Sequence, residues 1–323
     1  MSIHACAPDI YLPIEITSRE YAGHLLLAVE MASRGFNAVI GHKTPVVLAM
    51  RRAKRKGLHF YKNGFSVKGR SEFAWGQVGL DPEAGISYSK FHHFYDRRNG
   101  LHNLDNVKAQ FCYGPDDYEF LIQMHPQNAS KIHMTGSPRI SLWGRDKDQF
   151  FSDQISSIKK QYGSYVLFAN SKDLQENDVK KTWYRKSKVN NNSQSGPVKF
   201  YKYAVSLSEK IDIPLILRPH PKDNLYVWKS IAKNHTNICV DNRFALSAWT
   251  SGAVAVIHPG TSTSAIESVC GDTPAISLET NEGDVGDNFS KTLSHKVFDL
   301  DKLHEMIEKA MMEKLDTFPT LEA

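Results

Sequence analysis

Two short apolar runs, each ending at a His-Pro pair, constrain the fold of this chain most strongly. They are Ile213-Pro-Leu-Ile-Leu-Arg-Pro-His-Pro-Lys222 and Val254-Ala-Val-Ile-His-Pro-Gly-Thr-Ser-Thr-Ser264. Enrichment in Ile, Leu and Val is typical of strands that are buried on both faces of a parallel sheet. Polar residues follow both runs directly, and ligands of open α/β sheets bind just beyond the carboxyl ends of the strands. We therefore expect both motifs to lie at a ligand-binding edge.

Strands and helices alternate at short spacing in both halves of the chain. The expected strands cover residues 9–16, 37–41, 58–61, 166–169, 214–217, 238–240, 253–257 and 275–278. Such alternation predicts doubly wound parallel sheets, and 323 residues exceed the length of one typical domain. We predict an α/β, GT-B-like protein in which two Rossmann-like domains, residues 1–150 and 151–323, face a central cleft.

Helix boundaries are predicted from local signals in the first half. Ser18 is expected to cap a helix over residues 19–34, and Gly35 to end it. Thr44 followed by proline predicts a second helix start, with Gly57 as its end.

Charge and cysteine content narrow the class of protein. The net charge of +5 is compatible with an anionic substrate or an anionic membrane surface, but gives no support for nucleic-acid binding. The four cysteines show no paired spacing and are expected to be free thiols in a reducing cytosol. Neither a signal peptide nor a spanning segment is recognisable, so we expect a cytoplasmic protein. The basic residues within 43–56 form either a solvated helix face or a peripheral contact with the inner membrane.

The second motif has the composition of a phosphate site. It passes from strand to helix, and Ser262 or Thr263 is expected to cap that helix. Free N–H groups at a helix start bind anions, and hydroxyl groups add hydrogen bonds without charge. The predicted contacts are His258, Gly260, Thr261, Ser262, Thr263 and Ser264, with Glu267 placed one turn later to accept from ribose hydroxyls. The alternative is a plain cap on a core helix.

The first motif adds cationic and imidazole groups. Arg218 suits a two-pronged contact with phosphate or carboxylate, and His220 can donate to a phosphate oxygen or a leaving group. The alternative is a buried structural histidine with an arginine ion pair. Lys222 completes this set.

A pair of carboxylates in the first half forms a third candidate site. Asp81 and Glu83 lie between glycines in Gly79-Leu-Asp-Pro-Glu-Ala-Gly-Ile86. In a cleft, such a pair supplies a nucleophile or a general base, although Asp-Pro-Glu also starts helices. We expect no metal site and no cofactor, because Asp116 and Asp117 are adjacent but isolated. Phosphate-binding and sugar-binding chemistry together favour a nucleotide-sugar-dependent glycosyltransferase.

Five segments of the chain resemble bacterial surface-carbohydrate biosynthesis proteins. They are Leu12-Pro-Ile-Glu-Ile-Thr-Ser-Arg-Glu20, Leu25-Leu-Leu-Ala-Val-Glu30, Arg34-Gly-Phe36, Asp81-Pro-Glu-Ala-Gly85 and Thr135-Gly-Ser-Pro-Arg139. The His-Pro and Ser-rich motifs are similar to those of CMP-sugar-dependent GT-B enzymes, including the retaining β-Kdo transferases. Proline at position 82 departs from the family pattern, which has an acid there.

This resemblance implies transfer of a ulosonic acid, Kdo, from a CMP-activated donor to a lipopolysaccharide or capsule glycan. The first domain would bind the acceptor and supply the nucleophile, Glu83 or else Asp81. The second domain would bind the donor. There, His220 would assist departure of CMP, Ser262, Thr263 and Ser264 would hold its phosphate, and Glu267 its ribose. Arg218 or Lys222 would contact the sugar carboxylate, and a CMP leaving group needs no metal.

Two other classes remain open. One is a GT-B-like phosphotransferase, transferase or epimerase that uses CDP-glycerol or a UDP-sugar. The other is a non-catalytic GT-B-like domain that binds glycan or nucleotide within an assembly. Nucleotide preference separates the first class from the CMP-sugar reading, and absence of turnover identifies the second.

Overall fold

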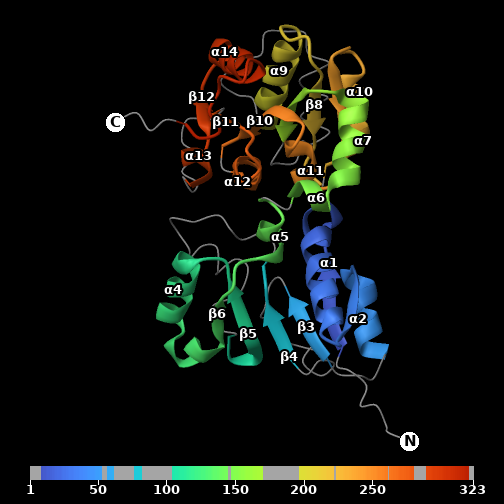
Figure 1. Cartoon of the computed structure of the whole chain (residues 1–323), viewed down its shortest axis with the longest axis vertical. Coiled ribbons are helices and arrows are strands. Elements are labelled where there is room, and N and C mark those ends of the chain that lie inside the picture. The colour runs from blue at the N-terminus through green and yellow to red at the C-terminus, as the bar shows by residue number, and fades with distance from the viewer. Residues whose placement is uncertain are drawn as a thin grey trace, which may run out of the picture. The chain divides into compact units, whose positions relative to one another are not determined.

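The chain folds into two compact units, Met1–Leu142 and Trp143–Ala323 (Figure 1). This computed structural model describes residues 9–52, 57–61, 76–81, 104–144, 147–169, 196–221, 223–260, 262–279 and 289–319. The boundary between the units in the sequence lies between Leu142 and Trp143, whereas the predicted domain boundary follows residue 150.

The first unit contains a six-stranded parallel sheet in the order β2-β1-β3-β4-β5-β6. Its strands are β1 (Asp9–Ile14), β2 (Asn37–His42), β3 (Gly57–Tyr61), β4 (Gly76–Gly79), β5 (Val107–Cys112) and β6 (Ile132–Met134). Its helices are α1 (Thr17–Ser33), α2 (Lys43–Arg52), α4 (Pro115–Met124) and α5 (Pro138–Ser141). Strand β2 lies on one side of β1, and β3 and the later strands lie on the other side, so the order of the strands reverses between β1 and β3. This topological switch point is where doubly wound sheets bind ligands.

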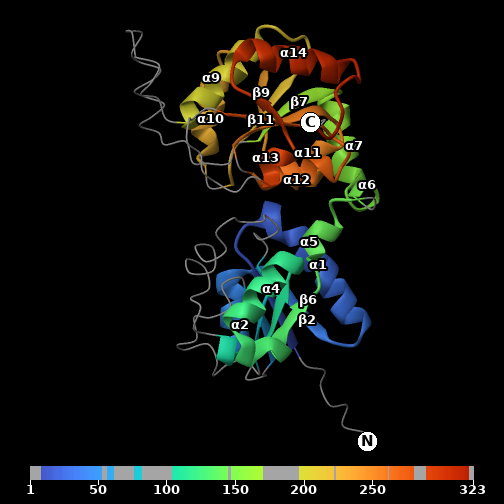
Figure 2. The ribbon, with the colours of Figure 1, turned by 90° about the vertical axis from the view of Figure 1, so that its left-hand side faces the viewer.

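Alternation along β1 explains why helices cover both faces of this sheet (Figure 2). Ile10 and Leu12 pack against Ala28 of α1, whereas Tyr11 packs against Val46 and Met50 of α2. Adjacent strand residues point to opposite faces, so a strand with apolar residues on both faces needs a helix on each side.

Two predicted helix boundaries are wrong. Helix α1 begins at Thr17 after Ile16, with no side-chain cap, so Ser18 lies inside the helix. Gly57 does not end α2 but is the first residue of β3. A Cβ at this position would lie 2.0 Å from the carbonyl oxygen of Asp9 on β1. Close pairing of β1 with β3 therefore requires glycine. Gly35 follows α1 with φ of +87°, as its predicted role as a stop requires.

The second unit contains a six-stranded parallel sheet in the order β12-β11-β10-β7-β8-β9. Its strands are β7 (Tyr165–Ala169), β8 (Leu215–Arg218), β9 (Ile238–Val240), β10 (Ala253–Pro259), β11 (Ala275–Leu278) and β12 (His295–Val297). Its helices are α6 (Lys147–Phe150), α7 (Ser152–Tyr162), α9 (Gly196–Ser208), α10 (Leu225–Ala232), α11 (Leu246–Thr250), α12 (Thr263–Val269), α13 (Phe289–Thr292) and α14 (Leu300–Met311). This is the six-strand Rossmann order, with its switch point between β7 and β10.

Strand β7 is the centre of this unit. All five of its residues are buried, and Phe168 packs against Phe200 of α9 in a core that includes Leu303 of α14. Tyr165 packs edge-on against Trp249 of α11. The doubly wound parallel sheets predicted from the strand-helix alternation are confirmed in both units.

Candidate functional site

The two His-Pro motifs lie at the same carboxyl edge of the second sheet. Strand β10 carries the Ser-rich motif and pairs with one side of β7, and β8 carries the Arg-Pro-His motif and pairs with the other side. The β10 motif therefore lies directly at the switch point, and the β8 motif lies one strand beyond it. This juxtaposition follows from topology and agrees with the placement predicted from the strand ends.

The Ser-rich segment forms a tightly bonded turn into α12. Gly260 adopts φ of +50°, and Ser262 is the helix cap, accepting from the Ser264 amide at 3.2 Å. The Ser262 hydroxyl also donates to Ser264 Oγ at 3.0 Å, and the Ser262 amide donates to Ser290 Oγ at 3.2 Å. Thr263 is half-buried, and Thr261 lies outside the described residues. The bonds of the two serines correspond to the plain-cap alternative.

His258 differs from the prediction of a phosphate ligand. It is fully buried, and its Nε2 lies 2.9 Å from the hydroxyl of Ser294, which donates to the Ser290 carbonyl. Because that hydroxyl proton is used, Nε2 donates to Ser294. Burial, with a smaller contribution from the charge of Lys291, lowers the pKa of His258 to about 4, against a backbone hydrogen bond with Gly260 that acts in the opposite direction. The imidazole is therefore neutral at pH 7 and ties β10 to the segment around α13.

Arg218 also has a structural role, through contacts that differ from the ion pair with a buried histidine that the sequence left open. Its guanidinium donates to the carbonyl oxygens of Arg243 at 3.0 Å and Phe244 at 2.7 Å, and it lies 5.9 Å from the Trp249 ring. Only 8% of the residue is exposed. Burial lowers its pKa to about 10, while the charge of Glu267 raises it, so the group is a cation at pH 7. Arg218 fixes the loop after β9, including Phe244 with φ of +63°.

Glu267 is not placed to meet a ribose. It is 3% exposed and accepts a hydrogen bond from the Ser247 hydroxyl of α11. The carboxylate lies between α12 and α11 and compensates the buried charge of Arg218. Its predicted place one turn into the helix is correct, but α11 covers that face of α12.

The loop after β8 presents His220. Asp223 organises this loop, since its carboxylate accepts from the His220 amide at 3.1 Å and from the Trp228 indole at 2.9 Å. The side chain of His220 is half-buried, and Lys222 lies outside the described residues. Within the described part of this motif, His220 is more accessible than Arg218.

The acidic candidate of the first unit also lies at a carboxyl sheet edge. Asp81 follows β4 and is 4% exposed. Its charge, together with the larger effect of desolvation, raises the pKa of Tyr113, which follows β5, and Arg139 of α5 acts in the opposite direction. Asp81 and Arg139 thus both lie near Tyr113. They belong to two of the segments that resemble the surface-carbohydrate proteins. Glu83 lies outside the described residues.

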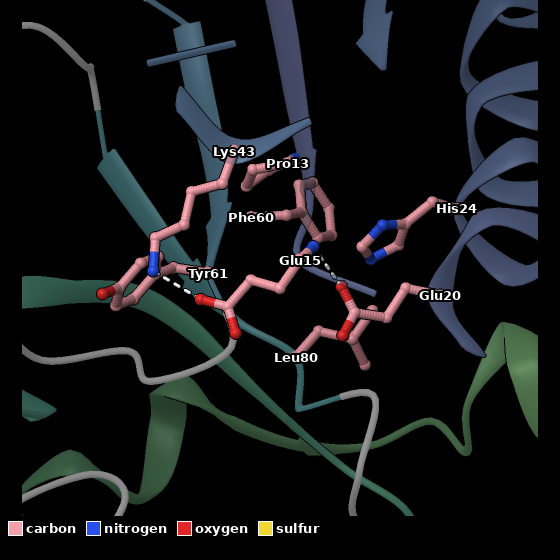
Figure 3. Close-up of a pocket in the computed structure, with 8 residues that line it drawn as sticks. All are labelled: Pro13, Glu15, Glu20, His24, Lys43, Phe60, Tyr61 and Leu80. Atoms are coloured by element: carbon pink, nitrogen blue, oxygen red, sulfur yellow. Dashed lines mark hydrogen bonds and ion pairs between the residues drawn. The ribbon is translucent and has the colours of Figure 1, made fainter. Parts of the chain in front are cut away.

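A pocket lies at the switch point of the first sheet, as Figure 3 shows. It is lined by residues from the ends of β1, β3 and β4 and from α1 and α2, namely Pro13, Glu15, Glu20, His24, Lys43, Phe60, Tyr61 and Leu80. Lys43 forms an ion pair with Glu15 and so belongs to this pocket, while Arg51 and Arg52 at the other end of α2 are exposed. None of the predicted catalytic or nucleotide-binding residues lines this pocket. The polar residues after β1 and the four-residue spacing of Glu20 and His24 were the available signals.

Comparison with known proteins shows the fold. No family model and no curated protein matches the chain in sequence. A structure of the wall teichoic acid polymerase TagF matches with a TM-score of 0.57 at 8% identity, covering 96% of this chain and 81% of that one. The UDP-N-acetylglucosamine 2-epimerase of Rickettsia bellii matches with a TM-score of 0.57 at 10% identity, covering 96% and 89%. The chain has the GT-B-like fold. The predicted fold class is confirmed.

A third similar structure is the UDP-GlcNAc 2-epimerase of Methanocaldococcus jannaschii. It matches with a TM-score of 0.55 at 12% identity and covers 97% of this chain and 96% of that one. In the described ranges, no helix is long and apolar enough to cross a membrane. The same residues contain no group of three or more His, Cys, Asp or Glu side chains arranged to hold a metal ion.

Proposed function

We propose that this protein is a glycosyltransferase that moves Kdo from a CMP-activated donor to a surface polysaccharide or lipopolysaccharide acceptor. The observation that carries the proposal is the placement of candidate groups at the carboxyl edges of both sheets. His220 and the Ser-rich turn lie at this edge in the second unit. Asp81 lies at the corresponding edge in the first. The choice of CMP-Kdo rests on the sequence resemblance.

The proposed reaction has two displacements. A carboxylate of the first unit, Glu83 or Asp81, attacks the anomeric carbon of Kdo, and the bond from that carbon to the CMP phosphate oxygen breaks with its electron pair leaving on CMP. An acceptor hydroxyl then displaces the carboxylate and loses its proton. His220 assists departure of CMP, and Ser262, Thr263 and Ser264 hold the phosphate. The structural roles of Arg218, His258 and Glu267 shape this edge without contacting the donor.

A second candidate function is a transferase or epimerase that uses CDP-glycerol or a UDP-sugar. The structural neighbours favour it, because they include TagF, one structure of which was soaked with CDPG, and two epimerases named for UDP-linked N-acetylglucosamine. Since their identity to this chain is 12% or less, the donor remains to be measured.

The testing experiment combines intact-protein mass spectrometry after incubation with CMP-Kdo, without acceptor, and a thermal-shift series with CMP, UDP and CDP-glycerol. We expect stabilisation by CMP and a mass gain of one Kdo residue, mapped by peptide analysis to Glu83 or Asp81. Stabilisation by UDP or CDP-glycerol alone would favour the second candidate. Stabilisation by none of the nucleotides, without an adduct, would reject both.

A further inference from the structure

The pocket at the switch point of the first sheet contains a buried carboxylate-imidazole pair. Glu20 and His24 are four residues apart on α1 and therefore project from the same face of the helix. Their exposed fractions are 2% and 7%. Figure 3 shows both side chains reaching from α1 toward Pro13 and Phe60 on the strands.

The carboxylate of this pair is held in place by the surrounding backbone and side chains. Its Oε2 accepts from the Glu15 amide at 2.7 Å, and its Oε1 accepts from the Arg19 guanidinium at 2.6 Å. On the other side of the pocket, Lys43 pairs with the Glu15 carboxylate, and its Nζ lies 5.6 Å from the centre of the Tyr61 ring. Glu20 is thus a fixed negative charge beside His24.

The imidazole, in contrast, has an unused polar atom. Nδ1 of His24 is buried and has no hydrogen-bond partner within the described structure. Burying such an atom without a partner costs stability, so its retention points to a group that binds there. Burial lowers the pKa of His24, with the charge of Glu20 acting in the opposite direction, so the ring is a neutral base at pH 7.

The size of the pocket limits what that group is. The space open to a water-sized group amounts to about 10 Å³, close to the volume that one water molecule needs. A hydroxyl group of a larger ligand fits this space, whereas a whole sugar ring does not. The aromatic and aliphatic side chains of Phe60, Tyr61, Pro13 and Leu80 form the rest of the wall.

We propose that this pocket receives the attacking hydroxyl of the acceptor and that His24 is the base that takes its proton. The inference rests on the proposed transfer function. In the second displacement, the hydroxyl oxygen bonds to the anomeric carbon, the bond from that carbon to the enzyme carboxylate breaks with its electrons returning to the carboxylate, and the proton moves to His24 Nδ1. Glu20 stabilises the imidazolium that forms.

The test measures transfer of Kdo to an acceptor separately from the reaction of the enzyme with the donor. Wild type, His24→Gln and Glu20→Gln are assayed for Kdo adduct formation without acceptor, and for transfer from CMP-Kdo to methyl glycosides of Kdo, galactose and N-acetylglucosamine. His24→Gln is expected to form the adduct as wild type does and to lose transfer by about 100-fold or more. His133→Gln, at an exposed position on β6, is the matched control and should keep both activities. Transfer by His24→Gln within about twofold of wild type overturns the proposal.

A second readout does not need turnover. In protein labelled with ¹⁵N-histidine, the His24 ring nitrogens should report a neutral imidazole near pH 7 and should shift when methyl glycosides are added. Unchanged His24 signals at saturating glycoside would mean that the pocket holds water only, and would overturn the proposal. If wild type neither binds CMP nor forms an adduct, the proposed function fails, while this titration still decides whether the pocket binds hydroxyl ligands.

Discussion

Replacing Arg218 with methionine distinguishes a structural role of this side chain from the donor-binding role that its sequence motif suggests. Methionine keeps an unbranched apolar stem but removes the guanidinium. The lost contacts are two hydrogen bonds to the carbonyl oxygens of Arg243 and Phe244 and the approach to the Trp249 ring. The substitution also leaves the buried charge of Glu267 without its nearby cation.

The expected loss in the free energy of unfolding can be estimated from those contacts. Hydrogen bonds from a charged group contribute about 1.5–3 kcal/mol each, and breaking a buried charge interaction by removing one partner costs about 3–5 kcal/mol. We expect the free energy of unfolding of the second unit to fall by about 3–5 kcal/mol, at the upper end of effects for single substitutions. Lys302→Met is the control, because its ion pair with Glu305 is exposed and screened by solvent, so that its loss should leave the free energy of unfolding nearly unchanged.

Urea unfolding followed by tryptophan fluorescence measures this change. Trp143, Trp228 and Trp249 are all buried in the second unit, so their emission reports on its unfolding. CMP affinity of the folded variant is measured in parallel by calorimetry and should change little. A variant that unfolds like wild type, within about 0.5 kcal/mol, but binds CMP about 100-fold more weakly would refute the structural role and restore Arg218 as a donor ligand.

Four further predictions test other parts of the structure. Gly57→Ala should destabilise the first unit by about 1–3 kcal/mol in chemical unfolding, because its Cβ meets the β1 backbone, and an unchanged midpoint would contradict the strand pairing. Ser262→Ala combined with Ser264→Ala should weaken CMP binding by about 1–3 kcal/mol in calorimetry, and unchanged affinity would place the donor elsewhere. Glu83→Ala should keep CMP binding but lose transfer by orders of magnitude in a Kdo-transfer assay, and near-normal turnover would end its role as nucleophile. Because the pKa of His258 is lowered to about 4 in the folded state, its contribution to stability should be complete above the usual pKa of about 6.5 and should decrease as the pH falls toward 4. Unfolding midpoints of wild type and His258→Asn across this range measure that contribution, and parallel curves would contradict it.

Strand positions were the part of the fold most accessible from the sequence. The expected strands at 238–240 and 275–278 match β9 and β11, and most others differ by one or two residues. Most of these strands are rich in apolar residues, as is typical of strands buried on both faces of a parallel sheet. The helix starts were harder, because α1 begins without a side-chain cap and Ser18 resembles a cap that the chain does not use.

The placement of the two His-Pro motifs at one sheet edge was predictable from the sequence, but the contacts of their side chains were not. The alternation of strands and helices predicts parallel strands, and parallel strands end at the same edge of their sheet, so both His-Pro motifs are expected at that edge. Whether a polar side chain faces a ligand or the protein depends on its three-dimensional neighbours. Arg218 is buried by the loop after β9, and Glu267 by α11, and both partners lie twenty or more residues away in sequence. Such contacts leave no mark on the local sequence of either residue.

The central position of β7 has a consequence for synthesis of the chain. It pairs with β8, which follows after one connection, and with β10, which is made only after β8 and β9. While the ribosome has not yet released residues 253–259, the fully apolar β7 has one open hydrogen-bonding edge. Unpaired strand edges of this kind are sites of association between chains, and long-range parallel pairing forms slowly. Nascent chains that stop short of β10 should therefore aggregate or recruit chaperones, and addition of that single strand should pair the second edge of β7.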